Sequence, residues 1–279
     1  MQRARVRQDD VGNDVTRFRM TSLGAWTLGM EVSAYLVGDI LIDTGFSYVR
    51  EPLLKALAGR EINLVCCSHG HEDHTGNCAA IAAAHDCPVY LRHADALWEE
   101  GVRALELYRR IWWGRVEPFD AREMPDVVES GGRSFEVIPA PGHARTQAVL
   151  YEAATGDVFT GDLVISPGAA AVLTWGNPWQ EVESLRRVAA LRPRRMLTGH
   201  GLIAEDPAPL LELKAERIED AARMSVELMS AGVAPRDVVK RIFPKGAFKD
   251  RFFEWLTSRE FSRLNFVLAA ARHAPEQIQ

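Results

Sequence analysis

The sequence contains no run of about eighteen apolar residues, so we expect no transmembrane helix. Its first residues, MQRARVRQDDVGND, are basic and then acidic, and they lack the apolar core of a signal peptide. The chain also has no internal repeat and no low-complexity tract. These absences predict a cytoplasmic protein that has no membrane partner.

The chain also has few cysteines and a small net charge. The chain has four cysteines, none of them spaced as CxxC, and Cys66 and Cys67 end the apolar run INLVCC. We expect these thiols to be buried and reduced. The net charge of −5 gives no general attraction to phosphate backbones. Nucleic acid is therefore not an expected partner, and binding it would need a local basic patch.

Strand-like and helix-like segments alternate up to about residue 204. Residues 32–38, 39–45 and 62–67 are rich in β-forming residues, whereas residues 47–59 and 78–85 have helical composition. This alternation predicts the α/β class. Beyond residue 206 the pattern becomes mostly helical. We therefore predict a catalytic domain at 1–204 and a helical, winged-helix-like extension at 205–279.

One short stretch concentrates the chemistry. SHGHEDHTGN, residues 68–77, follows a strand-like run and places three histidines and two carboxylates within six residues. In an extended loop, His69, His71 and Asp73 point to the same side, while His74 points elsewhere. A loop of this kind can supply ligands to two neighbouring metal ions.

Further candidate ligands follow other predicted strands. VIPAPGH ends at His143, VFTGD at Asp162 and RMLTGH at His200, and Asp43 in LIDTG has an equivalent place. Side chains at strand ends can be aimed into a shared cleft at the edge of a sheet. Five of the eight histidines lie in such motifs. We expect the other three to be surface or packing residues: His85, His93 and His273.

In their order, these motifs resemble the ligand motifs of the metallo-beta-lactamase superfamily. SHGHEDHTG is similar to its HxHxDH signature, and PGH, TGD and TGHG are similar to its later motifs, over roughly residues 16–203. The resemblance implies a four-layer αββα sandwich with a mostly helical C-terminal extension. It also implies the ligands: His69, His71 and His143 for one metal ion, Asp73, His74 and His200 for the second, Asp162 as the bridge, and Asp43 as support.

Histidine and carboxylate ligands suit zinc, iron or manganese, and we take zinc as the default for the two divalent metal ions. Two close ions lower the pKa of a bridging water, and Asp73 can orient the resulting hydroxide as a catalytic residue. We therefore predict hydrolysis of a small carboxylic ester, thioester or lactone. The alternatives are a metal-dependent phosphodiesterase or ribonuclease that uses the same site, and a non-hydrolytic diiron or structural metal protein.

Two features bear on the small-molecule substrate. The residues ARTQ, which follow His143, depart from the pattern of glutathione thioesterases and count against that subgroup. β-Lactamases proper commonly use a ligand set that includes cysteine, which counts against hydrolysis of antibiotics. The loop ISPGAAAVLTWGNPW after Asp162 is apolar, which favours an acyl or aromatic group over bare phosphate.

Two other segments leave alternatives open. Residues 98–117 interleave aromatic residues with arginines, as in Trp98, Tyr108, Trp112 and Trp113. This stripe indicates core packing, a lid over an acyl group, or the surface of a homodimer. A basic cluster near the C-terminus indicates either an anion contact or a solvated face. Its members are Lys240, Arg241, Lys245, Lys249 and Arg251.

Overall fold

The structure is a computed structural model that describes residues 4–27, 29–96, 105–165, 172–244, 247–276 and 278. The chain divides into two compact units. Unit 1 comprises residues 1–139, 145–165 and 193–206, and unit 2 comprises residues 140–144, 166–192 and 207–279. The domain boundary expected at residue 204 stays a prediction.

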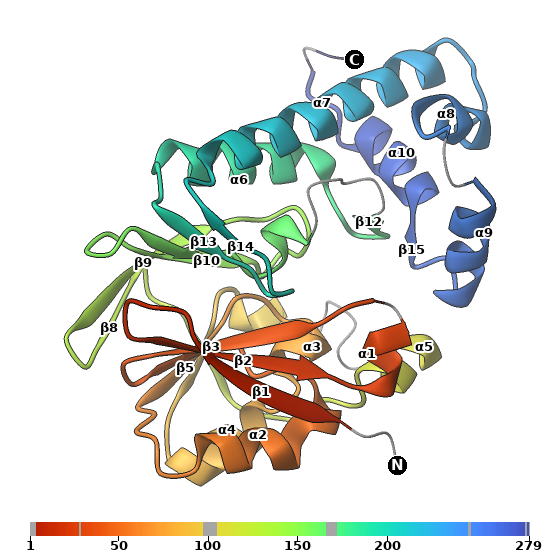
Figure 1. The fold of residues 1–279 in the computed structure, drawn as a ribbon. Helices are drawn as coiled ribbons and strands as arrows, with labels where there is room; N and C mark the ends of the chain where they lie inside the picture. The colour runs from red at the N-terminus through yellow and green to blue at the C-terminus, as the bar shows by residue number, and fades with distance from the viewer. Residues whose placement is uncertain are drawn as a thin grey trace. The chain divides into compact units, whose positions relative to one another are not determined.

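Unit 1 contains a seven-stranded sheet in the order β1-β2-β3-β4-β5-β6-β7 (Figure 1). Its strands are β1 (Arg5–Asp10), β2 (Val15–Thr21), β3 (Val32–Val37), β4 (Ile40–Ile42), β5 (Leu64–Cys67), β6 (Val89–Leu91) and β7 (Ala121–Glu123). The strands from β1 to β4 pair antiparallel, and those from β4 to β7 pair parallel. Every residue of β3, β4 and β5 is buried, as expected for strands covered on both faces.

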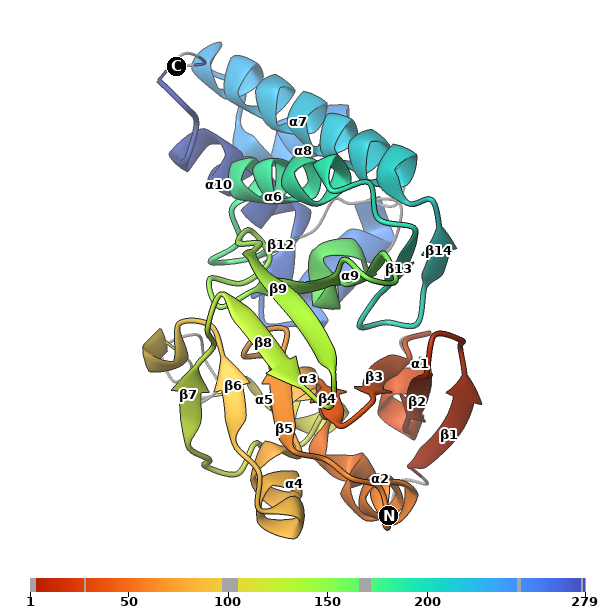
Figure 2. The same ribbon diagram turned by 90° about the vertical axis from the view of Figure 1, so that its left-hand side faces the viewer.

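Two helices lie against one face of this sheet (Figures 1 and 2). They are α2 (Arg50–Leu57) and α4 (Cys78–His85). Leu53 and Leu57 of α2 and Ile81 of α4 share a buried cluster with sheet residues such as Val65. Cys78 and Ile81 are the buried residues of α4, and Asp86 ends this helix in the left-handed conformation.

A six-stranded sheet, in the order β14-β13-β11-β10-β9-β8, forms the other layer of unit 1. Its strands are β8 (Val127–Ser130), β9 (Arg133–Pro139), β10 (Ala148–Glu152), β11 (Asp157–Phe159), β13 (Arg195–Leu197) and β14 (Ile203–Glu205). Only β11 and β13 pair in parallel among these described strands. Tyr35 and Ile42 of the first sheet share a buried cluster with Phe135 and Phe159 of the second, so the two sheets pack face to face.

Unit 2 is mostly helical. It comprises α6 (Pro178–Ala190), α7 (Ala208–Ser230), α8 (Pro235–Ile242), α9 (Ala247–Leu256), α10 (Arg263–Arg272) and the short strands β12 (Val172–Leu173) and β15 (Phe261–Ser262). Asn177 caps α6 by accepting from the Trp179 amide, and the Trp179 indole donates to the Ala270 carbonyl at 2.9 Å. The predicted helical C-terminal region is confirmed. In the described residues, no helix is both long and apolar enough to cross a membrane.

The structure describes the segment at 94–117 in part. Its described part holds a short 3₁₀ turn at Ala94–Ala96 and α5 at Leu107–Trp112. Residues 97–104, which include Trp98, lie outside the described residues. Trp113 is buried against Phe46, with ring centroids 5.2 Å apart, so this end of the aromatic stripe is core.

Candidate metal centre

Two pairs of parallel strands bring the candidate ligands to one end of unit 1. Asp43 follows β4 and His69 follows its parallel neighbour β5. Asp162 follows β11 and His200 follows β13, which are likewise parallel neighbours. Because parallel strands present their carboxyl ends at the same edge, residues distant in sequence converge there.

The histidine loop is extended only in part. His71 has extended backbone angles, but Glu72–Thr75 form a single helical turn, α3. The expected alternation therefore applies to His69 and His71, whereas the helical turn sets the directions of Asp73 and His74. The loop is held closely, since a Cβ on Gly76 would lie 2.6 Å from the Glu72 carbonyl oxygen. Glycine is required there because the opposing atoms are backbone.

One group of ligand atoms lies at His69, His71 and Asp162, all within 4.8 Å of one another. The Nε2 atom of His69 is 2.9 Å from Nδ1 of His71 and 3.9 Å from Oδ2 of Asp162. All three side chains are buried. His143, the further ligand predicted for this position, belongs to the 140–144 stretch of unit 2, and its ligation stays a prediction.

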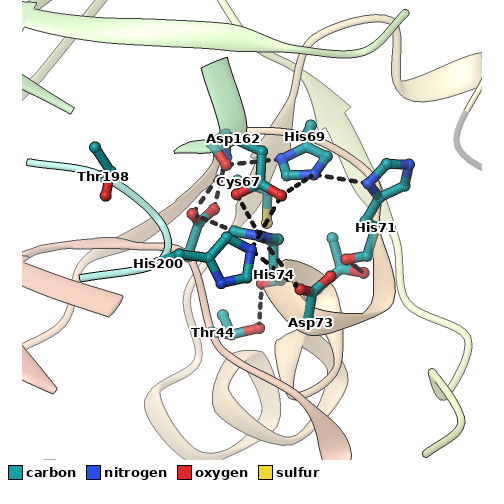
Figure 3. A network of polar contacts seen from close by, with 12 residues as sticks. Thr44, Cys67, His69, His71, Asp73, His74, Asp162, Thr198 and His200 are labelled. Atoms are coloured by element: carbon teal, nitrogen blue, oxygen red, sulfur yellow. Dashed lines mark hydrogen bonds and ion pairs between the residues drawn. The ribbon is translucent and has the colours of Figure 1, made fainter. Parts of the chain in front are cut away.

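A second group comprises Asp73, His74, Asp162 and His200, again within 4.8 Å (Figure 3). Nε2 of His74 is 3.2 Å from Oδ1 of Asp162, and Nε2 of His200 is 3.2 Å from Oδ2. Asp73 lies 3.7 Å from both imidazoles. Asp162 belongs to both groups, which is the arrangement expected of a carboxylate that bridges two metal ions.

Hydrogen bonds around the site fix the histidine tautomers. Nδ1 of His200 is 2.8 Å from the Glu31 carbonyl oxygen, which can only accept, so this nitrogen carries the proton. Nδ1 of His74 likewise donates to Asp43 at 2.8 Å. In both rings Nε2 is left with a lone pair directed at the carboxylates, as metal ligation requires.

Asp43 also orients His69, through Ser68. Its carboxylate accepts from the Ser68 amide at 2.7 Å and from the Ser68 hydroxyl at 2.9 Å. Because that hydroxyl has one hydrogen, it accepts from Nδ1 of His69, 3.0 Å away, and leaves the His69 Nε2 lone pair for a ligand. Asp43 adopts a φ of 60°, a conformation uncommon for residues other than glycine. One strained residue thus sets the tautomer of two ligands.

The charges of the site fit divalent cations. Burial alone would lower the pKa of His74, but Asp162, Asp43 and Asp73 outweigh it and raise that pKa well above its usual value. Burial likewise opposes ionisation of Asp162, yet His200 and His74 hold its pKa well below the usual range. Without a cation, these carboxylates favour protonation of His74. The Nε2 atom of His74 is buried and lies 3.2 Å from Oδ1 of Asp162 without a hydrogen bond of regular geometry in the described chain, which suits a metal ion between them.

Glu72 has a role that the sequence motif does not reveal. The motif leaves it outside the ligand set, and neither group of ligand atoms includes it. It is 1% exposed and forms a two-pronged ion pair with Arg109 of α5, at 2.7 Å from Nε and 2.5 Å from Nη2. Arg109 is itself 5% exposed. The pair attaches the ligand loop to α5, and no spacing rule in the sequence links the two residues.

Residues 28–200 match the family model described as the Metallo-beta-lactamase superfamily. A hydroxyacylglutathione hydrolase of Rhodobacter capsulatus is 30% identical over 167 residues, which are 58% of this chain and 58% of that enzyme. The Beta-lactamase-like protein 2 homolog of Drosophila melanogaster is 24% identical over 264 residues, 81% of each chain. The match thus spans little more than half of the Rhodobacter enzyme.

Solved structures share the fold. A beta-lactamase domain protein from Burkholderia ambifaria has a TM-score of 0.67 at 17% identity, covering 94% of this chain and 87% of that one. The structure of TTHA1623 in a di-iron-bound form has a TM-score of 0.54 at 29% identity, covering 67% of this chain and 93% of that one. These likenesses confirm the predicted sandwich fold of the family with its additional C-terminal helices.

Proposed function

The chain belongs to the metallo-beta-lactamase superfamily, and on that premise we propose that it is a metal-dependent hydrolase of a small carboxylic ester, thioester or lactone. The observation that carries the proposal is the pair of ligand groups that share Asp162. The similarity to hydroxyacylglutathione hydrolases supports hydrolysis of an acyl compound.

Six residues of unit 1 would hold two divalent metal ions: His69, His71, Asp73, His74, Asp162 and His200. We propose His143 as a further ligand of the first ion. When bound, the ions supply an activated water and polarise the carbonyl oxygen of the substrate. Zinc is our proposal for their identity, and the di-iron form of TTHA1623 makes iron the alternative to test.

Asp73 is the residue we assign to proton handling. Its side chain is 9% exposed, against 4% for Asp162 and none for His74, so it is the carboxylate of the second group most open to water. A carboxylate in this position accepts a hydrogen bond from the attacking water and holds its proton. Asp162, more deeply buried between two imidazoles, instead keeps the two ligand groups together.

The first experiment measures metal content. We expect two equivalents of metal in the purified protein, and loss of metal and of esterase activity in the His71→Ala variant. His85→Ala is the matched control, because His85 ends α4 outside both ligand groups. A parent protein that takes up no metal after reconstitution would contradict the site assignment.

The second experiment identifies the substrate class. A panel of aryl esters, lactones, acyl-glutathione, acyl-coenzyme A and bis(p-nitrophenyl) phosphate is assayed with the metal-loaded protein. We expect turnover of carboxylic substrates that is lost in the Asp73→Asn variant. Turnover of the phosphodiester alone would instead support the phosphodiesterase or ribonuclease alternative, with the same metal site.

A further inference from the structure

Unit 2 contains a cavity of about 310 Å³ that is separate from the proposed metal centre. It lies among α8, α9, β15 and α10, which are labelled in Figure 1. The residues that line it are Arg236, Val239, Lys240, Phe243, Arg251, Glu254, Ser262, Arg263 and Leu264. Its volume falls at the lower end of the range of small-molecule sites.

Four of these lining residues are cationic and one is anionic. Arg236 pairs with Glu254 at 3.0 Å, and Lys240 pairs with Asp237 at 2.7 Å. The Lys240–Asp237 pair is exposed on both sides, at 69% and 55%, whereas the Glu254 side chain is only 12% exposed beside an arginine at 56%. An exposed pair contributes little to stability, so Lys240 can turn to a bound anion at small cost, while Arg236 stays with Glu254. The cavity is thus suited to a ligand of more than one negative charge.

Arg263 contributes its guanidinium to this wall. The guanidinium carbon lies over the ring of Phe243, 5.0 Å from the centroid. That ring in turn packs edge-on against Phe266, which is 1% exposed. The guanidinium is thus placed beside an apolar surface, and an arginine in such a setting favours charge-assisted recognition of a phosphate.

Besides Ser262, the remainder of the lining is apolar: Val239, Phe243 and Leu264. A bare inorganic anion would leave this surface without a partner, whereas an organic phosphate would cover it. We propose that the cavity binds a phosphate monoester of a planar or apolar group, of about the size of a nucleoside monophosphate. The phosphate lies against Arg263 and Arg251, and the organic part lies along the apolar side.

The test is equilibrium dialysis of adenosine 5′-monophosphate with the full-length protein. We expect saturable binding at one site, at least tenfold tighter than that of adenosine or of inorganic phosphate. Arg263→Gln should weaken binding at least tenfold, as expected for loss of a charge-assisted hydrogen bond. Arg272→Gln, at the exposed other end of α10, is the matched control and should change affinity less than twofold.

Three outcomes would overturn the inference. Equal weakening by the two arginine variants would indicate only general attraction by positive charge. Loss of binding in His71→Ala would place the nucleotide at the metal centre instead. Binding of a single-stranded oligonucleotide without binding of the mononucleotide would indicate a different class of ligand. Since the readout is binding, it is independent of whether the metal centre hydrolyses esters.

Discussion

Replacing Arg109 by methionine removes the cation that holds the ligand loop to α5. Glu72 would then be a carboxylate at 1% exposure that has lost its two-pronged partner. Breaking a buried ion pair in this way typically costs about 3–5 kcal/mol, because one charge stays buried without compensation. We expect a loss of that size in the free energy of unfolding at pH 7.

The loss should depend on pH in a predictable direction. Burial already raises the pKa of Glu72 above its usual value of 4.5, although Arg109 lowers it. Without Arg109 that pKa rises further, so the folded state binds a proton that the unfolded chain releases. The destabilisation therefore grows as pH rises above about 4.5, and it shrinks below that value, where Glu72 is protonated in both states.

Urea unfolding of the metal-free protein measures the effect, since bound metal would add its own stabilisation. The control is Arg50→Met, which breaks an equally short but exposed pair with Glu117, 2.6 Å long, and should cost about 1 kcal/mol or less. A Glu72→Leu/Arg109→Met double variant should recover most of the loss. The reasoning would be refuted by an Arg109→Met loss no larger than that of Arg50→Met, or by a double variant no more stable than the single one.

Three further predictions concern the metal centre. Gly199→Ala would place a Cβ 2.5 Å from Cε1 of His74 and should abolish metal binding in the second group. The control Gly232→Ala strains the backbone, since its φ is +80°, but its Cβ would meet no atom within 4 Å beyond its chain neighbours, so it should retain metal; elemental analysis distinguishes the two variants. In Asp43→Asn the amide nitrogen cannot accept the hydrogen bond that the His74 imidazole donates, so metal affinity should fall about 10–100-fold in competition with a chelator. The raised pKa values of His74 and His200 mean that protons compete with metal, so affinity should keep rising with pH above 6.5. Calorimetry in buffers of different ionisation enthalpy should then show proton release on metal binding, and its absence would contradict this assignment.

The sequence predicts which candidate ligands lie close together because strand ends and ligand motifs coincide. β5, β11 and β13 each end two or three residues before a ligand, and buried apolar runs are easily recognised as strands. The sequence does not predict the helical turn α3, because four residues are too few for a periodic pattern. Its formation depends on contacts such as that of the Thr75 hydroxyl with the His71 carbonyl, 2.9 Å long.

Sequence patterns do not predict contacts between distant segments. An arginine within the helix at 107–112 is expected on the solvent-exposed face, and only the folded structure places Arg109 against Glu72. The cavity of unit 2 is a similar case. The sequence indicates an anion contact or a solvated face for Lys240 and Arg251, and Arg236 and Arg263 join them only through the packing of α8 against α10.

The loop thus contains two adjacent carboxylates with different kinds of partner. Glu72 pairs with an arginine, whose positive charge persists at every pH at which the protein folds, so this residue serves to fix the loop. Asp73 faces the imidazoles of His74 and His200, whose charge depends on protons or metal. Because the fixed pair holds the loop independently of the metal, the proton transfer that we propose for Asp73 would not disturb the backbone that positions it. This difference in partners, rather than in the carboxylates themselves, separates the structural residue from the one we propose as catalytic.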